Sequence, residues 1–291
     1  MNKETNWKLN YNATKRFIKK GYIVGKNTLI KNIYKIPGKK ELKIDLKRKK
    51  IKLERYKKER LKKEHISLDK YNETFEKVTL SSIHEDLAIT ISSGYDTNYL
   101  LYNIRKKLNK PINAFCIGGR IGRNEIPIAQ KICEKYPNMK FFSKLVDGDS
   151  LIKYPEIIFA LEGAIYESGI FLQYELSKLV NKSGNHNIVL GECADQVLNY
   201  ELYHPFMAVI NKIKYNKSKI IKKLIKNIDY KPYKDVYEMA SYKIIKKNGI
   251  LMNYFGLNPE YPYLRTEFIK IAKNVVELGD KEKIFHKKVI D

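Results

Sequence analysis

The pattern of hydrophobic and polar positions changes twice along the 291 residues of this chain. Apolar and charged residues alternate at 41–46 and again at 50–56, which predicts a β-hairpin with one apolar face. Because an isolated hairpin is only marginally stable, we expect that face to pack against another part of the protein. The next stretch, about 57–86, is rich in charge and is expected to be a mainly helical, solvated connector.

From residue 87 onward, short apolar runs alternate with amphipathic stretches. Strands are predicted at 87–91, 112–117, 140–146 and 187–190, with helices at 97–108, 126–136 and 169–181, and a largely helical part after residue 200. Strands that alternate with helices predict an α/β fold with a doubly wound parallel sheet. In such a sheet, ligands bind beyond the carboxyl ends of the strands.

Composition adds a strong positive charge to this picture. The formal net charge is +25, and 43% of the residues are hydrophobic, enough for a globular core. A solvated lysine-rich surface is the simpler interpretation, and a polyanionic partner such as RNA is the alternative. The chain has three cysteines without metal-ligand spacing, no signal-peptide pattern and no apolar run of about 20 residues. These features predict a cytoplasmic protein with free thiols and no membrane partner.

The most informative local feature is the segment Ser92-Ser93-Gly94-Tyr95-Asp96-Thr97, which lies between a predicted strand and a predicted helix. Backbone amides in such a turn, together with the helix N-terminus, bind anions, and the Ser92 and Thr97 hydroxyls can donate to phosphate oxygens. Asp96 would repel a phosphate by itself, so Mg²⁺ is the natural complement. By itself the segment could also be an ordinary turn with polar residues near a helix cap.

This segment resembles the pyrophosphate loop of the N-type ATP pyrophosphatases, usually Ser-Gly-Gly-Xaa-Asp-Ser. Ser93 stands where the first glycine is expected, and Thr97 replaces the serine while keeping its hydroxyl. The resemblance implies that ATP binds at Ser92, Ser93, Gly94, Asp96 and Thr97. It also implies an adenine nucleotide alpha hydrolase-like fold, with the adenine near Ile117 and Gly118.

A second segment, Gly191-Glu192-Cys193-Ala194-Asp195-Gln196, resembles the Gly-Glu-Gly-Ala-Asp-Glu motif of the asparagine synthetase family. Taken alone, Glu192 and Asp195 could simply cap a helix. The resemblance implies that Gly191 and Glu192 contact the nucleotide and that Asp195 binds Mg²⁺ together with Asp96.

Three further segments resemble the same family. Glu162 stands where a helical glutamate is thought to transfer protons during amide formation, although Tyr166-Glu167-Ser168 replaces the common Asp-Pro-Ser. Pro262-Tyr263-Leu264-Arg265 resembles Pro-Phe-Leu-Asp, with a reversed final charge. Lys287, or Lys288 in the alternative register, stands where a lysine neutralises the charge of the adenylate and pyrophosphate.

The first zone also fits this family. Residues 21–38, continuing to 56, look like the closing part of its glutaminase domain, but no cysteine precedes Cys116 to serve as the nucleophile. We therefore expect a remnant of a glutaminase-like β domain at 1–60, a synthetase-type domain at 61–291, and no glutamine hydrolysis of that family's kind.

These resemblances imply an ATP-dependent ligase that adenylates a small-molecule or peptide carboxylate, by default aspartate, and releases AMP and pyrophosphate. The nitrogen would come from free ammonia, a separate glutaminase subunit or another amine, as in the β-lactam-forming and lasso-peptide-cyclising relatives. Two alternatives stay open: a tRNA-modifying ATP pyrophosphatase, and a catalytically weak partner subunit.

Overall fold

The structure is a computed structural model, and it describes residues 7–20, 23, 25–37, 40–55, 66–120, 124–161, 169–198, 244–277 and 286. Within these residues the main sheet has five strands in the order β5-β4-β3-β6-β7, and every pairing is parallel. The strands are β3 (Ala88–Thr90), β4 (Ile112–Gly119), β5 (Met139–Val146), β6 (Asn187–Val189) and β7 (Asn258–Glu260). The predicted parallel α/β sheet is therefore confirmed.

Both faces of the sheet are buried, because alternate residues of each strand belong to different cores. In β3, Ile89 packs with one cluster that includes α2, α3, α4 and α12, whereas Ala88 packs with a second cluster beside α6 and α11. β6 repeats this division, with Val189 in the first cluster and Ile188 in the second. Period-two alternation thus gives each face its own apolar layer, as a doubly wound sheet requires.

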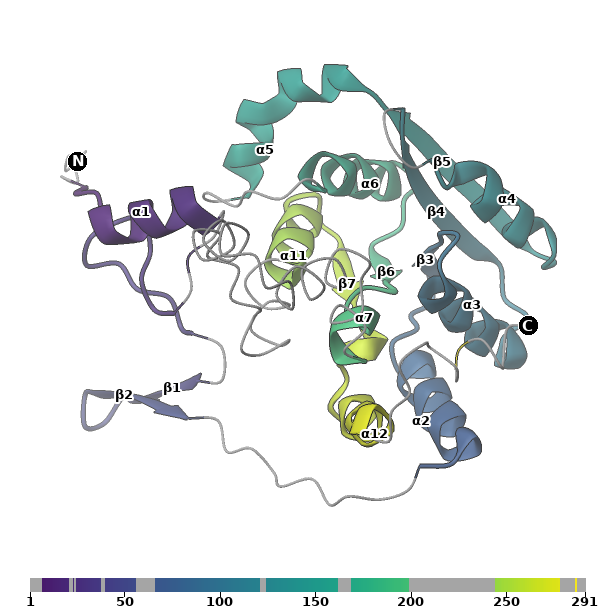
Figure 1. The fold of residues 1–291 in the computed structure, drawn as a ribbon, viewed down its shortest axis with the longest axis horizontal. Coiled ribbons are helices and arrows are strands. Elements are labelled where there is room, and N and C mark those ends of the chain that lie inside the picture. Colours follow the sequence, from purple (N-terminus) through teal and green to yellow (C-terminus); the bar gives the residue numbers. More distant parts are fainter. Residues whose placement is uncertain are drawn as a thin grey trace, which may run out of the picture.

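Helices cover the two faces of the sheet, with α3 and α4 on one side and α6 and α11 on the other (Figure 1). The described helices of this part are α2 (Leu68–Leu80), α3 (Tyr95–Lys107), α4 (Ile126–Glu134), α5 (Tyr154–Ala160), α6 (Ile170–Lys182), α7 (Ala194–Val197), α11 (Ile245–Tyr254) and α12 (Thr266–Glu277), with 3-10 turns at Gly148–Lys153 and Pro262–Leu264. The direction in which successive strands are added to the sheet reverses at β3: β4 and β5 lie on one side of it, and β6 and β7 on the other. This reversal is the position at which open α/β sheets bind ligands.

The N-terminal part contains helix α1 (Tyr11–Lys20) and the predicted hairpin, with β1 (Lys40–Asp45) paired antiparallel to β2 (Lys50–Arg55). Figure 1 shows this hairpin apart from the main sheet. Leu42 pairs with Leu53 and Ile44 with Ile51, which makes one face apolar as predicted. All four side chains are exposed, so the expectation that this face packs against another element is not met within the described residues.

The structure adds detail to two other expectations. The described part of the connector contains helix α2, which begins only at Leu68, and residues 56–64 lie outside the described residues. The C-terminal part is not wholly helical, because β7 adds an edge strand to the sheet. β7 has three residues and includes Pro259, so it carried no alternating pattern to reveal it. No helix in the described part of the chain is long and apolar enough to span a membrane.

Candidate functional site

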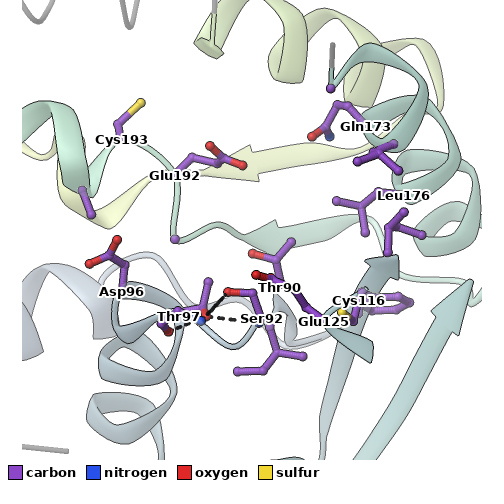
Figure 2. A pocket seen from close by; sticks show the side chains of 18 of the residues that line it. Thr90, Ser92, Asp96, Thr97, Cys116, Glu125, Gln173, Leu176, Glu192 and Cys193 are labelled. Carbon is purple, nitrogen blue, oxygen red and sulfur yellow. Dashed lines mark hydrogen bonds between the residues drawn. The ribbon is translucent and has the colours of Figure 1, made fainter. Parts of the chain in front are cut away.

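The loop after β3 is held together by the hydroxyls of Ser92 and Thr97, which lie 2.9 Å apart. The Ser92 amide donates to Thr97 Oγ1 over 3.1 Å, and the Gly94 amide donates to Ser92 Oγ over 3.1 Å (Figure 2). Helix α3 starts directly after Gly94, so its N-terminus points into the same loop. These amides and hydroxyls are the groups with which such a loop engages an anion.

Ser93 does not strain this loop, although it stands where the pyrophosphate loop has glycine. Its backbone has no positive φ. Its hydroxyl donates to Glu125 Oε1 over 3.0 Å, which ties the loop to the residue before α4. Ser93 itself does not line the cavity described below, whereas Glu125 does. The Ser93 side chain therefore stabilises the loop through its hydrogen bond to Glu125 and does not face the cavity.

The segment after β6 meets the start of α3 at Gly191. A Cβ atom added to Gly191 would lie 2.7 Å from Thr97 Cγ2 and 3.3 Å from Thr97 Cα. Only a glycine allows so close an approach. The segment then turns at Cys193, whose φ of 71° is the left-handed conformation that glycine adopts more readily, and enters α7. Backbone strain is thus absent at Ser93 but present at Cys193, in the segment that carries Glu192 and Asp195.

The two segments enclose one side of a cavity of about 410 Å³ at the carboxyl ends of β3 and β6. Most of the predicted site residues line it: Ser92, Gly94, Asp96, Thr97, Ile117, Gly191, Glu192 and Asp195. The volume is in the range of small-molecule sites. The structure therefore brings together residues from two distant segments, as the family resemblance implies.

Charge in this cavity is mainly negative. The described lining contains the carboxylates of Asp96, Glu125, Glu192 and Asp195, and a single lysine, Lys247. A polyphosphate would be repelled here unless cations accompanied it. Within the described residues, no group of three or more His, Cys, Asp and Glu side chains could hold a metal ion without further ligands. One or two carboxylates completed by substrate phosphates is the usual arrangement for Mg²⁺, so the residues present fit that ion.

The opposite end of the cavity is largely apolar. Phe115, Cys116 and Ile117 of β4 face Leu172 and Leu176 of α6 across the cavity. Figure 2 shows Cys116 on the strand below Leu176, with the Gln173 amide pointing into the space between α6 and Glu192. Burial raises the pKa of the Cys116 thiol to about 12, so it remains neutral and contributes to the apolar wall. This end can accommodate a planar base or an apolar substrate group.

Gly118 does not line the cavity, contrary to its predicted role beside the adenine. A Cβ atom there would lie 2.4 Å from Asn124 Oδ1 and 2.9 Å from Ile126 Cδ1. Gly118 instead allows the segment before α4 to pack closely against β4. Of the predicted adenine neighbours, only Ile117 lines the cavity.

Two predicted catalytic residues, Glu162 and Lys287, and the fallback Lys288 lie outside the described residues. Their predicted roles remain predictions. Arg265, whose reversed charge had no assigned consequence, forms an ion pair of 2.5 Å with Glu260 of β7 and contacts the Ser82 hydroxyl. Its charge is therefore balanced within the fold.

The sequence did not reveal several residues that complete this site. Glu125, Gln173 and Lys247 line the cavity, and each is a single polar residue without a recognisable motif. Tyr263 from the Pro262-Tyr263-Leu264 match donates its hydroxyl to the Asp96 carbonyl over 2.9 Å. Burial and the neighbouring Asp96 raise the pKa of Tyr263 well above its usual value, which keeps this donor protonated.

His286 is another buried residue that the sequence did not reveal. Its ring is fully inaccessible to solvent. Nδ1 lies 3.1 Å from Asp96 Oδ1, and Nε2 lies 2.8 Å from the Tyr71 hydroxyl. Its only sequence signal was its position next to the predicted Lys287.

Comparison with known proteins finds a family model that matches the central part of the chain. Residues 84–216 match the family model described as asparagine synthase. A solved U34-tRNA thiolase, NcsA from Methanococcus maripaludis with its 4Fe-4S cluster, is similar at 15% identity and a TM-score of 0.33, covering 77% of this chain and 72% of that chain. No curated protein matches. The family match supports an ATP-dependent enzyme. Residues 84–216 of the chain are thus similar to the asparagine synthase family.

Proposed function

We propose that this protein is an ATP-dependent amide-forming ligase that adenylates a carboxylate and releases AMP and pyrophosphate. One observation carries the proposal: the loop of Asp96 and the loop of Asp195 line one cavity at the switch point of the sheet. The two loops are also in direct contact, because Gly191 packs closely against Thr97. If the acidic residues of either loop only capped a helix, the two loops would not need to line the same cavity.

The reaction has two steps in this proposal. A carboxylate oxygen of the acid attacks the α-phosphorus of ATP, the bond from that phosphorus to the bridging oxygen breaks, and pyrophosphate leaves. The nitrogen of an amine then attacks the acyl carbon, loses a proton, and AMP leaves. The chain contributes to both steps mainly by positioning the reactants and by stabilising negative charge.

The described residues supply particular parts of this chemistry. The Ser92 and Thr97 hydroxyls and the α3 N-terminus would orient the phosphates. Asp96 and Asp195 would hold Mg²⁺, which when bound neutralises phosphate charge. Lys247 places the only cation of the described lining in the cavity, so it adds to the role proposed for Lys287. Glu162 would accept the proton of the attacking amine.

Aspartate with ammonia is the default substrate pair, and a separate glutaminase subunit is the proposed alternative source of nitrogen. The apolar end of the cavity beside Leu172 and Leu176 also fits a larger substrate group than aspartate. A panel of acids must therefore include apolar and peptide carboxylates.

The test is a pyrophosphate-release assay over a panel of carboxylic acids, with ammonia and Mg²⁺ present and AMP measured in parallel. We expect one class of acid to produce equal amounts of AMP and pyrophosphate. Asp96→Asn and Asp195→Asn should each lower the rate at least about a hundredfold. Asp45→Asn, on the exposed hairpin, serves as the matched control and should leave the rate unchanged. Unchanged turnover in both cavity variants would reject the proposed site.

The net charge of +25 favours a second candidate, an ATP pyrophosphatase that acts on RNA. The same assay separates the two functions when bulk tRNA replaces the acids. Pyrophosphate release that requires RNA and falls steeply with salt would support this candidate. A protein that neither binds nor cleaves ATP under any of these conditions would instead fit a catalytically weak partner subunit.

A further inference from the structure

His286 contacts the predicted metal ligand Asp96, which lies 190 positions earlier in the chain. The ring is fully buried and stacks on Tyr99, with ring centroids 4.3 Å apart and planes inclined by 19°. Its two nitrogens lie 3.1 Å from Asp96 Oδ1 and 2.8 Å from the Tyr71 hydroxyl. Both ends of the imidazole therefore have defined partners.

The chemistry of the partners assigns the hydrogen atoms. An ionised carboxylate only accepts hydrogen bonds, so Nδ1 carries the proton that is donated to Asp96. In the neutral ring Nε2 is then an acceptor, and the Tyr71 hydroxyl donates to it. Tyr71 is itself a buried residue of α2 and packs against Phe268 of α12. The direction of the imidazole N–H is thus determined by the packed core.

Asp96 is held from two sides by this arrangement. Tyr263 donates to its backbone carbonyl, and His286 donates to its side-chain Oδ1. The side chain also lines the cavity. Asp96 would hold the metal ion while its orientation is fixed by the His286 contact.

We propose that His286 is a positioning residue: it holds the Asp96 carboxylate in the orientation that binds the Mg²⁺ of Mg-ATP. This role rests on the proposed function. Ligand side chains whose orientation is fixed by a hydrogen-bonded partner bind metal more tightly, because less conformational freedom is lost on binding. The contact between His286 and Asp96 is therefore part of the formation of the ATP site.

Two variants test the contributions of the two ring nitrogens separately. His286→Asn places an amide N–H close to the position of Nδ1 and retains the donor to Asp96. His286→Gln places its amide near Nε2 and retains only the Tyr71 contact. Both variants lose the stacking on Tyr99, so the loss of packing is matched between them. Tyr71→Phe removes the other hydrogen bond and keeps the ring of Tyr71.

The measurement is calorimetric titration of the full-length protein with α,β-methylene-ATP, in excess Mg²⁺ and separately in EDTA. We expect His286→Gln to weaken binding roughly tenfold in Mg²⁺ and to raise the Mg²⁺ concentration needed for half-maximal binding. His286→Asn and Tyr71→Phe should stay within about threefold of the wild type. In EDTA all four proteins should bind alike.

Equal affinities for the Gln and Asn variants in Mg²⁺ would overturn the positioning role, since packing alone would then explain their behaviour. Tighter Mg²⁺-dependent binding by His286→Gln would overturn it as well, because His286 would then compete with the metal. If the wild type bound the analogue poorly in both buffers, the proposed ATP site itself would be rejected, and the role of His286 with it.

Discussion

Gly191 and Thr97 are in contact in a way that no other residue at 191 would allow, since a Cβ atom would lie 2.7 Å from Thr97 Cγ2. Thr97 cannot easily move away, because its hydroxyl is bonded to the Ser92 amide and lies 2.9 Å from the Ser92 hydroxyl. The two acidic loops of the cavity thus touch at Gly191 and Thr97, and a single methyl group added at position 191 would force them apart.

Gly191→Ala should therefore separate the loops. We expect a loss of about 1–3 kcal/mol in the free energy of unfolding, the usual cost of overpacking, together with weaker ATP binding. Chemical denaturation and nucleotide titration would measure the two effects. Thr97→Ser removes Cγ2 and keeps the hydroxyl, so the double variant should recover part of both losses. A double variant as impaired as Gly191→Ala would show that the clash with Cγ2 is not the cause.

Lys247 should contribute directly to nucleotide affinity, because it is the only lysine or arginine in the described lining of the cavity. Lys247→Met keeps the length of the side chain and removes the charge. The loss of a charge-assisted hydrogen bond predicts about tenfold weaker ATP binding or more. Lys246→Met is the matched control, since Lys246 lies near Lys35 and does not line the cavity. Calorimetric titration that shows equal losses in both variants would assign the effect to net charge alone.

At position 193, the usual order of stability between an alanine and a glycine variant should be reversed. In ordinary backbone conformations, alanine is more stable than glycine by about 0.5–1 kcal/mol. At the φ of 71° found for Cys193, however, a Cβ atom costs about 1–2 kcal/mol. Cys193→Gly should therefore be more stable than Cys193→Ala by about 1 kcal/mol, and both lose the buried thiol. Thermal and chemical unfolding would compare them, and a more stable alanine variant would contradict strain at this position.

Asp86 should make stability depend on pH in acid. It accepts hydrogen bonds from the His186 amide at 2.7 Å, the Asn187 amide at 3.2 Å and Asn187 Nδ2 at 2.7 Å. Burial opposes its ionisation, but these three donors outweigh burial and lower the pKa of Asp86.

Because the folded pKa lies below the unfolded value of about 3.9, this contribution is present above about pH 4. It is lost as the pH falls through the folded pKa. Asp86→Asn should cost about 1–3 kcal/mol at pH 7, since a carboxylate that accepts from three donors is replaced by an amide. The difference from the wild type should shrink at pH 3. Urea denaturation at both values measures this, and a difference independent of pH would exclude ionised Asp86 as its source.

Local patterns in the sequence were sufficient to predict the elements that carry the first half of the site. The run at 87–91 followed by the turn at Gly94 predicted β3 and α3, and the run at 187–190 predicted β6. The segments around Asp96 and Asp195 were recognisable because they resemble two motifs of one family, whereas each taken alone could have been an ordinary turn or helix cap. By itself, the sequence thus determined the α/β class, the parallel sheet and the two loops at the strand ends.

Only the tertiary structure decided which residues complete the cavity or contact the residues that line it. Gln173, Lys247 and His286 are single polar residues on separate helical segments, and no short-range pattern distinguishes them from solvated ones. Gly118 was misplaced for the same reason, because its role depends on Asn124 and Ile126 packing back onto β4. Secondary structure follows from periodicity over a few residues, whereas burial of a charged or polar side chain depends on which distant surfaces meet it. The contact of His286 with Asp96 exists only because the folded core brings the two ends of the domain together.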